Sequence, residues 1–197
     1  RSSRVNSQRI LDKLNLKNFK HNPRFYGRRK GRKLSKSGIT ALESSDNYFI
    51  HENDFREFLL KSENQIVLEI GFGDGDNLVN SAIKNENLLH IGADPFLNAN
   101  VKCIKKLLKN NLKNVKIWPD DIRKIITYFP FNSIIAVKIL FPDPWPKLKH
   151  KNRRLIQKEF INTLYNILCP NGIITIATDH KIMKSWILEI FQNNLGF

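Results

Sequence analysis

The chain has 197 residues, and its hydrophobic content of 41% is enough for a single folded domain and excludes a disordered polypeptide. Lysine and arginine number 33 against 18 acids, for a formal net charge of +15, which favours a polyanionic partner such as a nucleic acid, although a basic bias of the whole proteome would give the same charge. No apolar run approaches the ~20 residues that span a bilayer, and no secretory signal is evident, so we expect a cytoplasmic protein without a membrane partner.

The first 45 residues (1–45) are predicted to form a basic extension, followed by the main domain at 46–197. Val5 to Phe19 has a weak helical spacing of apolar residues. The chain begins with Arg1 rather than Met, so we expect it to be trimmed or to be part of a longer polypeptide. Its two cysteines match no metal-binding spacing, and we expect free thiols and no metal site.

A basic arm is predicted at Asn22 to Ser37, where Arg28, Arg29 and other basic residues are interleaved with Phe25 and Tyr26. Such a stretch does not bury a core by itself. It suits an arm that lies on a phosphate backbone and stacks on an exposed base. A solvated tail has the same composition, so the sequence leaves both readings open.

The main domain alternates predicted helices and strands, which favours a Rossmann-like, doubly wound and mostly parallel α/β sheet. Apolar periodicity and turn residues predict strands at Ile66–Ile70, Leu88–Ala93, Val115–Trp118, Ser133–Phe141 and Gly172–Thr178. They predict helices at Tyr48–Leu60, Asn77–Asn85, Asn98–Asn110, Asp121–Tyr128, Asn152–Leu168 and Ile182–Phe191.

A glycine-rich turn follows the first strand, with glycines at 71, 73 and 75 in the stretch EIGFGDGD. Glycine lets the backbone adopt tight or left-handed conformations and approach a ligand closely. Glu69 ends the strand before the turn, and Asp94 ends the next strand. Strand, glycine turn, helix, strand and acid together predict a nucleoside-binding unit.

The cofactor of this unit is predicted from charge. The glycines do not follow the GxGxxG spacing, and Asp74 and Asp76 stand where a dinucleotide would place its phosphates. S-adenosylmethionine carries an ammonium and a sulfonium and no phosphate, so carboxylates favour it. An acid at the end of the second strand, here Asp94, is suited to the ribose hydroxyls.

Every predicted strand ends in a carboxylate, although a single aspartate there is commonly a helix cap. The fourth strand leads into FPDPWPK, residues 141–147, where two prolines fix the backbone around Asp143. Trp145 offers a flat stacking surface, and a basic run that begins at Lys147 includes Arg153 and Arg154. A proline-rich structural turn is the alternative interpretation.

These motifs together resemble the bacterial tRNA (guanine-N7-)-methyltransferases, from the basic arm YGRRKGRKL through EIGFGDG and FPDPWPK to ATDH. FPDPW-x-K followed by a basic helix with two arginines is the most specific of them. The resemblance implies a class I S-adenosylmethionine-dependent methyltransferase that methylates N7 of a guanine in the variable loop of tRNA.

The resemblance also implies the site residues. Glu69, Asp94 and Asp120 would lie around the cofactor together with the glycine turn (Gly71, Gly73, Gly75), and Asp143 would be the catalytic aspartate. The tRNA or its target base would be contacted by Lys147, Asp179, Arg28, Arg29, Arg153 and Arg154.

Three departures from the family pattern are evident. The acid of the second strand is Asp94 rather than the usual glutamate, and Asp121 stands where a small residue is common, so Asp120 is preferred within that pair. The family's C-terminal segment, with a T-x-x-E motif and the last two strands, is expected to be missing after Phe197.

Guanine N7 carries a lone pair and no proton, so its methylation needs alignment with the methyl donor and no general base. Asp143 is therefore predicted to orient the guanine or to stabilise charge. Two alternatives stay open: another Rossmann-like methyltransferase, acting on a base amine or a protein glutamine, and a non-catalytic RNA-binding module. The sequence is compatible with a monomer or a homodimer.

Overall fold

The structure is a computed structural model that describes residues 23–50, 52–62 and 65–192. The predicted helix at Val5–Phe19 lies outside the described residues. None of the described helices is long and apolar enough to cross a membrane.

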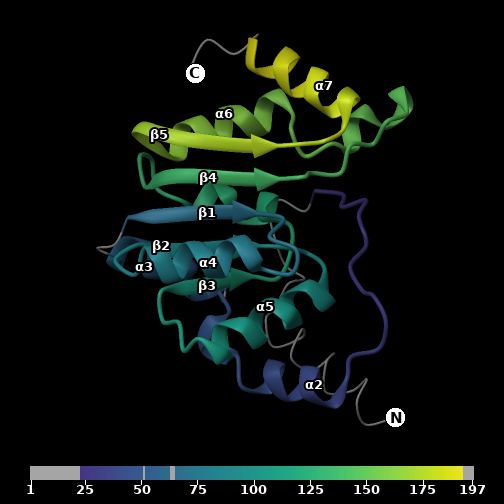
Figure 1. Cartoon of the computed structure of the whole chain (residues 1–197). Coiled ribbons are helices and arrows are strands. Elements are labelled where there is room, and N and C mark those ends of the chain that lie inside the picture. The colour runs from purple at the N-terminus through teal and green to yellow at the C-terminus, as the bar shows by residue number, and fades with distance from the viewer. Residues whose placement is uncertain (1–22, 51, 63–64, 193–197) are drawn as a thin grey trace.

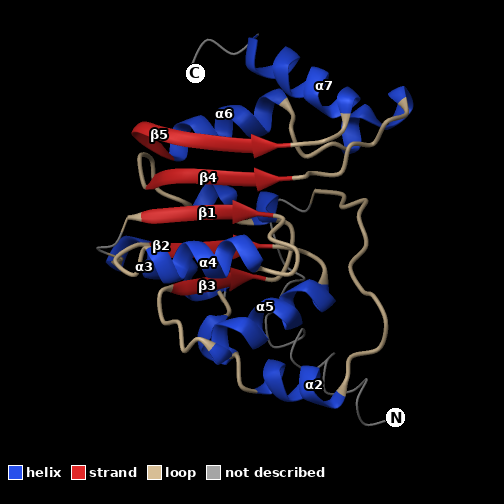
Figure 2. Cartoon of the chain, viewed as in Figure 1, coloured by secondary structure: helices blue, strands red, loops and turns tan. Residues whose placement is uncertain are grey.

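Five parallel strands form one sheet in the order β3-β2-β1-β4-β5 (Figures 1 and 2). This confirms the predicted Rossmann-like fold. Since β1 pairs with both β2 and β4, the order of the strands reverses at β1, and ligands of open α/β sheets bind in the crevice at such a point. The strands are β1 (Ile66–Ile70), β2 (Leu89–Ala93), β3 (Val115–Trp118), β4 (Ile134–Leu140) and β5 (Leu168–Ala177).

Helices cover both faces of the sheet, and the described elements are drawn in Figure 1. The α-helices are α2 (Lys36–Glu43), α3 (Glu52–Lys61), α4 (Asp76–Lys84), α5 (Leu97–Lys109), α6 (Lys158–Ile167) and α7 (Lys181–Gln192). Short 3₁₀ helices are η1 (Asp46–Tyr48), η2 (Ile122–Lys124), η3 (Ile126–Tyr128) and η4 (Leu148–Arg153).

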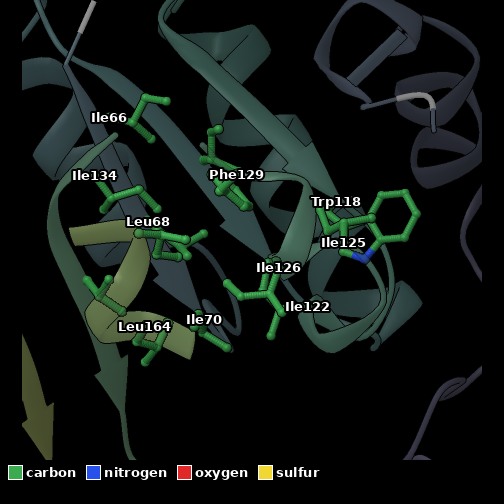
Figure 3. Packing of buried hydrophobic residues seen from close by; sticks show 14 of the residues in the cluster. Ile66, Leu68, Ile70, Trp118, Ile122, Ile125, Ile126, Phe129, Ile134 and Leu164 are labelled. Carbon is green, nitrogen blue, oxygen red and sulfur yellow. The ribbon is translucent and has the colours of Figure 1, made fainter. Parts of the chain in front are cut away.

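The core has two parts, one on each face of the sheet. On one face, Ile66, Leu68 and Ile70 of β1 pack against η2, η3 and α6, as the close view shows (Figure 3). On the other face, α4 and α5 pack through Leu78, Ile104 and their neighbours. All five residues of β1 are buried, which is why this strand reads as a continuous apolar run interrupted only by Glu69.

Three predicted helices and one predicted strand differ from the structure. The helix predicted at Tyr48–Leu60 begins at Glu52 as α3, because Tyr48 belongs to η1. The strand predicted at Gly172–Thr178 begins at Leu168 as β5. The segment predicted as one helix at Asp121–Tyr128 forms the two 3₁₀ turns η2 and η3. The helix predicted from Asn152 begins only at Lys158, because Arg154 and Gln157 have extended backbones between η4 and α6. That break lets the side chain of Arg154 turn back toward the loop after β4, where it is buried.

The end of the basic stretch is part of the folded domain. Lys36–Glu43 forms α2, whose N-terminus is capped by Ser35 through a hydrogen bond from the Gly38 amide. α2 packs on α5, and Ala41 and Leu42 are buried in the core of that face. Only the part before α2 is an irregular segment, and it crosses the edge of the sheet where the strands end (Figure 1).

Candidate active site

The glycine turn after β1 has a positive φ at Gly71, Gly73 and Gly75 (75°, 54° and 79°), a conformation that other residues adopt only with strain. At Gly75 a side chain is also excluded by packing, since a Cβ atom would lie 2.5 Å from Sγ of Cys103 in α5. At Gly71 and Gly73 a Cβ atom would meet no atom within 4 Å. The turn is therefore packed on α5 at one end and open at the other.

Asp94 holds this turn from the end of β2. Its Oδ2 accepts a hydrogen bond from the Gly73 amide at 2.9 Å, and its Oδ1 accepts one from the Phe96 amide at 2.8 Å. The side chain is buried, and burial raises the pKa of Asp94 above its usual value, to which the nearby negative charge of Asp143 also contributes. The two acids therefore share one electrostatic environment.

Glu69 lies beneath the turn. It is 2% exposed, and burial raises its pKa. Its Oε2 accepts a hydrogen bond from the side-chain Nδ2 of Asn77 in α4 at 2.6 Å. It does not line the cavity described below. In this structure Glu69 joins β1 to the first turn of α4.

The acids within the turn are paired with α5. Lys102 binds Asp74 at 2.8 Å and Lys106 binds Asp76 at 2.6 Å. Neither acid lines the cavity. Because each is matched by a lysine, these two charges repel a phosphate less than the sequence predicts. The carboxylates that do line the cavity are Asp94, Asp121 and Asp143.

A cavity of about 360 Å³ lies at the ends of β1, β2 and β4, in the crevice expected from the strand order. It brings together five of the predicted site residues: Gly71, Asp94, Asp143, Arg28 and Arg153. Part of its wall is apolar, with Ile70 and Ile139 from the sheet, Ile122 from η2 and Leu155 from the segment before α6.

The basic arm forms another wall of this cavity through Phe25, Tyr26, Gly27 and Arg28. The sequence predicts only an RNA-binding role for the arm and does not predict that these residues line the cavity. Phe25 in this wall also stacks with Arg29 outside it, whose guanidinium carbon lies 4.9 Å from the ring centroid. Local composition carries no signal for it, because contacts more than sixty residues away place the arm there.

Asp120 is buried beside the cavity and does not line it. Its Oδ1 accepts hydrogen bonds from Arg29 Nη1 at 2.6 Å and from the Asp121 amide at 2.7 Å. Its Oδ2 accepts one from Lys124 Nζ at 2.7 Å. Of the adjacent pair of acids, Asp121 is the one in the cavity wall, where it is paired with Arg123.

The loop after β4 presents Asp143 to the cavity with its side chain exposed. Phe141 and Trp145 on either side of it have positive φ values of 52° and 40°. Strained backbone of this kind persists where the surroundings fix it. Arg154 does so here: its Nε donates to the Pro144 carbonyl at 3.0 Å and its Nη2 to the Trp145 carbonyl at 3.2 Å.

Arg154 differs from its neighbour Arg153. Its side chain is 4% exposed and stacks on Trp186 of α7, so it supports the loop and is not available to a tRNA phosphate. Arg153 stacks on the rings of Tyr26 and Trp145, at 4.8 and 5.0 Å from their centroids. Arg153 thus links the arm to the loop that carries Asp143.

The last two predicted site residues lie outside the cavity. Lys147 is exposed where the loop enters η4, and Asp179 is exposed between β5 and α7. Asp179 follows the last residue of β5 by two positions, and Lys147 lies in the loop that follows β4. The described part of the chain holds no cluster of three or more His, Cys, Asp or Glu that could bind a metal ion.

Comparisons with known proteins identify relatives of this chain. Residues 63–197 match the family model Methyltransf_4, described as "Putative methyltransferase". A tRNA (guanine-N(7)-)-methyltransferase of Wolbachia pipientis wMel is 41% identical over 66% of this chain and 59% of its own length. One from Hyphomonas neptunium is 36% identical over 88% of this chain and 81% of its own length.

The chain spans less than two thirds of the first of these relatives, and 58% of a tRNA (guanine-N(7)-)-methyltransferase of Buchnera aphidicola that is 39% identical. Among solved structures, an rRNA methylase from Streptococcus thermophilus aligns with a TM-score of 0.51 at 19% identity, over 73% of this chain and 78% of that one. This similarity to a solved structure shows the fold alone. On the sequence matches, the chain belongs to the tRNA (guanine-N(7)-)-methyltransferase family.

Proposed function

We propose that this protein transfers a methyl group from S-adenosylmethionine to N7 of a guanine in the variable loop of tRNA. One observation carries the proposal: a single cavity is lined by Gly71 of the glycine turn, by Asp94 and by the exposed carboxylate of Asp143. A donor beside Asp94 and an acceptor beside Asp143 would meet between the ends of β1 and β4.

The cavity fits the cofactor in shape and in charge. Its volume of about 360 Å³ lies within the range of about 300–1,000 Å³ usual for small-molecule sites. The absence of any atom within 4 Å of a Cβ at Gly71 leaves room for a ligand against the backbone. Asp94 is suited to ribose hydroxyls, and apolar groups such as Ile122 and Leu155 are suited to adenine.

S-adenosylmethionine supplies an activated methyl group on a sulfonium. The protein has to align guanine N7 with that methyl group, and no residue has to remove a proton because N7 carries none. Asp143 is suited to accept hydrogen bonds from the guanine N–H groups and so to orient the base. Its negative charge also favours the positive charge that the purine acquires.

The acceptor side of the cavity is basic and aromatic, as an RNA site requires. Arg28 and Arg153 line the cavity, and Lys147 lies outside it on the same loop as Asp143. Tyr26 and Trp145 present rings that already stack with a planar cation, Arg153. We propose that phosphates of the tRNA bind these basic groups and that Asp179 contacts the RNA from the end of β5.

The experiment incubates tRNA with the chain and methyl-labelled S-adenosylmethionine, and then cleaves the RNA with aniline at N7-methylguanine. We expect label in the RNA and a single cleavage in the variable loop. A matched RNA with 7-deazaguanosine at that position lacks N7 and should accept no label. Label without aniline cleavage, or label in the 7-deaza RNA, would contradict methylation of N7.

The same experiment separates the alternatives. An enzyme that methylates an exocyclic amine would label the 7-deaza RNA, because that RNA retains the amine. A non-catalytic RNA-binding module would bind tRNA without affinity for the cofactor in a calorimetric titration. The two free cysteines and the tRNA substrate support a further proposal, that the protein acts in the cytoplasm.

A further inference from the structure

The arm is fixed at two places, one on each side of the four residues that line the cavity. On one side, Arg123 Nη2 donates to the Arg24 carbonyl at 3.2 Å. On the other side, the Leu97 amide donates to the Arg29 carbonyl at 2.9 Å, and the Asn98 side chain bonds to Gly31 and Arg32. Phe25 to Arg28 are the stretch between these attachments and form the wall.

The Arg29 side chain adds the strongest contact to the second attachment. Its Nη1 lies 2.6 Å from Oδ1 of Asp120, whose own side chain is 2% exposed, whereas the side chain of Arg29 is 44% exposed. Charge-assisted hydrogen bonds to a buried carboxylate are stronger than neutral ones. Both oxygens of Asp120 are occupied by donors from the protein, which are Arg29, Lys124 and the Asp121 amide.

We propose that Asp120 is a positioning residue for the cofactor site and not a ligand of the cofactor: through Arg29 it holds the arm as a wall of the cavity. The inference rests on the proposed function, since the ligand under the arm is taken to be S-adenosylmethionine. Cofactor affinity then depends on Arg29, although the Arg29 side chain does not line the cavity.

Binding of RNA to the arm is linked to binding of the cofactor beneath it. The arm that closes the cavity carries the arginines proposed to bind tRNA, and an RNA phosphate that holds the arm in place stabilises the wall. Linkage requires that each ligand raise the affinity for the other by the same factor. The protein without RNA therefore binds the cofactor more weakly than the complex with tRNA.

The test measures the affinity of the protein for S-adenosylhomocysteine by calorimetry, with and without tRNA. Arg29→Met should weaken binding about tenfold without RNA, the loss expected for one hydrogen bond between charged groups. Arg32→Met is the matched control: it removes a charge from the same arm, and Arg32 contributes only its carbonyl to the second attachment, so affinity without RNA should not change.

A double-mutant cycle distinguishes positioning from direct contact. If Asp120 acts through Arg29, adding Asp120→Asn to Arg29→Met should cause no further loss of affinity. If Asp120 binds the cofactor, the further loss should equal that of Asp120→Asn alone, which overturns the inference. Asp120→Asn removes the carboxylate that pairs with the buried Lys124, so thermal unfolding of each variant establishes that it is folded at the temperature of the titration.

A second readout does not depend on the ligand. Chymotrypsin cleaves after aromatic residues, and Phe25 and Tyr26 lie in the wall. Cleavage there should be faster in Arg29→Met than in the wild type or Arg32→Met. Unchanged affinity and unchanged cleavage in Arg29→Met would overturn the inference while the wild type still methylates tRNA. A wild type that binds no S-adenosylhomocysteine would overturn the proposed function as well.

Discussion

Arg154 and Trp186 stack beneath the loop that carries Asp143, with the guanidinium carbon 4.7 Å from the centroid of the ring. The indole of Trp186 is itself fixed, because its Nε1 donates to the Ile156 carbonyl at 2.6 Å. The contact joins α7 to the carbonyls of Pro144 and Trp145 through one buried side chain. The conformation of the active-site loop thus depends on a helix late in the chain.

Arg154→Met should therefore lower stability and activity together. The loss of two hydrogen bonds from a charged group to partly buried carbonyls costs about 3 kcal/mol, or about 6–12 °C in the unfolding temperature of a domain of this size. Arg153→Met is the matched control, since it removes the same charge one position away. It should leave the unfolding temperature nearly unchanged and raise the KM for tRNA. Equal unfolding temperatures for the two variants would contradict the supporting role of Arg154.

The glycine turn provides a second pair of variants. Gly75→Ala places a Cβ atom 2.5 Å from Cys103 Sγ in a backbone with φ of 79°, and overpacking together with strain should destabilise the fold by about 2–4 kcal/mol. The Cβ atom of Gly73→Ala would have no protein atom within 4 Å, so the variant should lose only the backbone strain, about 1–2 kcal/mol of folding stability.

The two variants should differ in binding as well. Gly73 does not line the cavity, but a methyl group there points into open space two residues after Gly71, which does, and it should weaken S-adenosylhomocysteine binding in protein that is still folded. Chemical denaturation and calorimetry on both variants check this. If Gly73→Ala binds as tightly as the wild type, the open space there is not the cofactor's.

Much of the fold could be predicted from sequence because strand signals here are local. Ile66–Ile70 and Val115–Trp118 have the predicted bounds, since a short buried strand reads as an apolar run between turn residues. The predicted start of α6 at Asn152 is wrong, because Arg154 has an extended backbone and its side chain binds the loop after β4. A buried arginine of this kind has no signature in a basic run.

The candidate site could be predicted only in part. Gly71, Asp94 and Asp143 were predicted from strand ends, which parallel topology brings to one edge. The choice between Asp120 and Asp121 depends on which side chain turns inward, and the pairing of Arg29 with Asp120 joins residues ninety-one positions apart. Sequence spacing carries no information on such contacts.

His90 should make stability depend on pH. It is fully buried in β2, and burial lowers its pKa below the ordinary value of 6.5, an effect that the nearby Asn85 backbone only partly opposes. Below pH 6.5 the unfolded chain takes up a proton that the folded protein does not. Stability is therefore lost as the pH falls from 6.5 toward the lower pKa of the folded state, by about 1.4 kcal/mol per pH unit.

His90→Leu keeps a side chain of similar size and removes this titration. Urea unfolding between pH 7 and pH 5 should show a smaller loss of stability in the variant than in the wild type. Glu69 and Asp94, whose pKa values are raised by burial, act in the opposite direction, but they are present in both proteins and cancel in the difference. Parallel pH dependences would contradict a neutral buried His90.

Asp143→Asn tests the proposed role of the carboxylate. Its side chain is exposed at the cavity and forms no hydrogen bond or ion pair with another described residue, so the variant should fold normally. Asparagine keeps the size but loses the charge and one acceptor. We expect kcat to fall about 100-fold or more, the effect of removing one preorganised electrostatic contact to a transition state, with little change in S-adenosylhomocysteine affinity.

The decisive comparison is turnover per bound cofactor, obtained from single-turnover methylation of tRNA at saturating S-adenosylmethionine. Raising the pH should not restore the variant, because guanine N7 has no proton for a stronger base to remove. Asp143→Glu keeps the charge and moves it by one methylene, so it should retain more activity than Asp143→Asn if charge matters more than exact placement. Lost cofactor binding with unchanged single-turnover methylation would instead assign Asp143 to the donor side of the cavity.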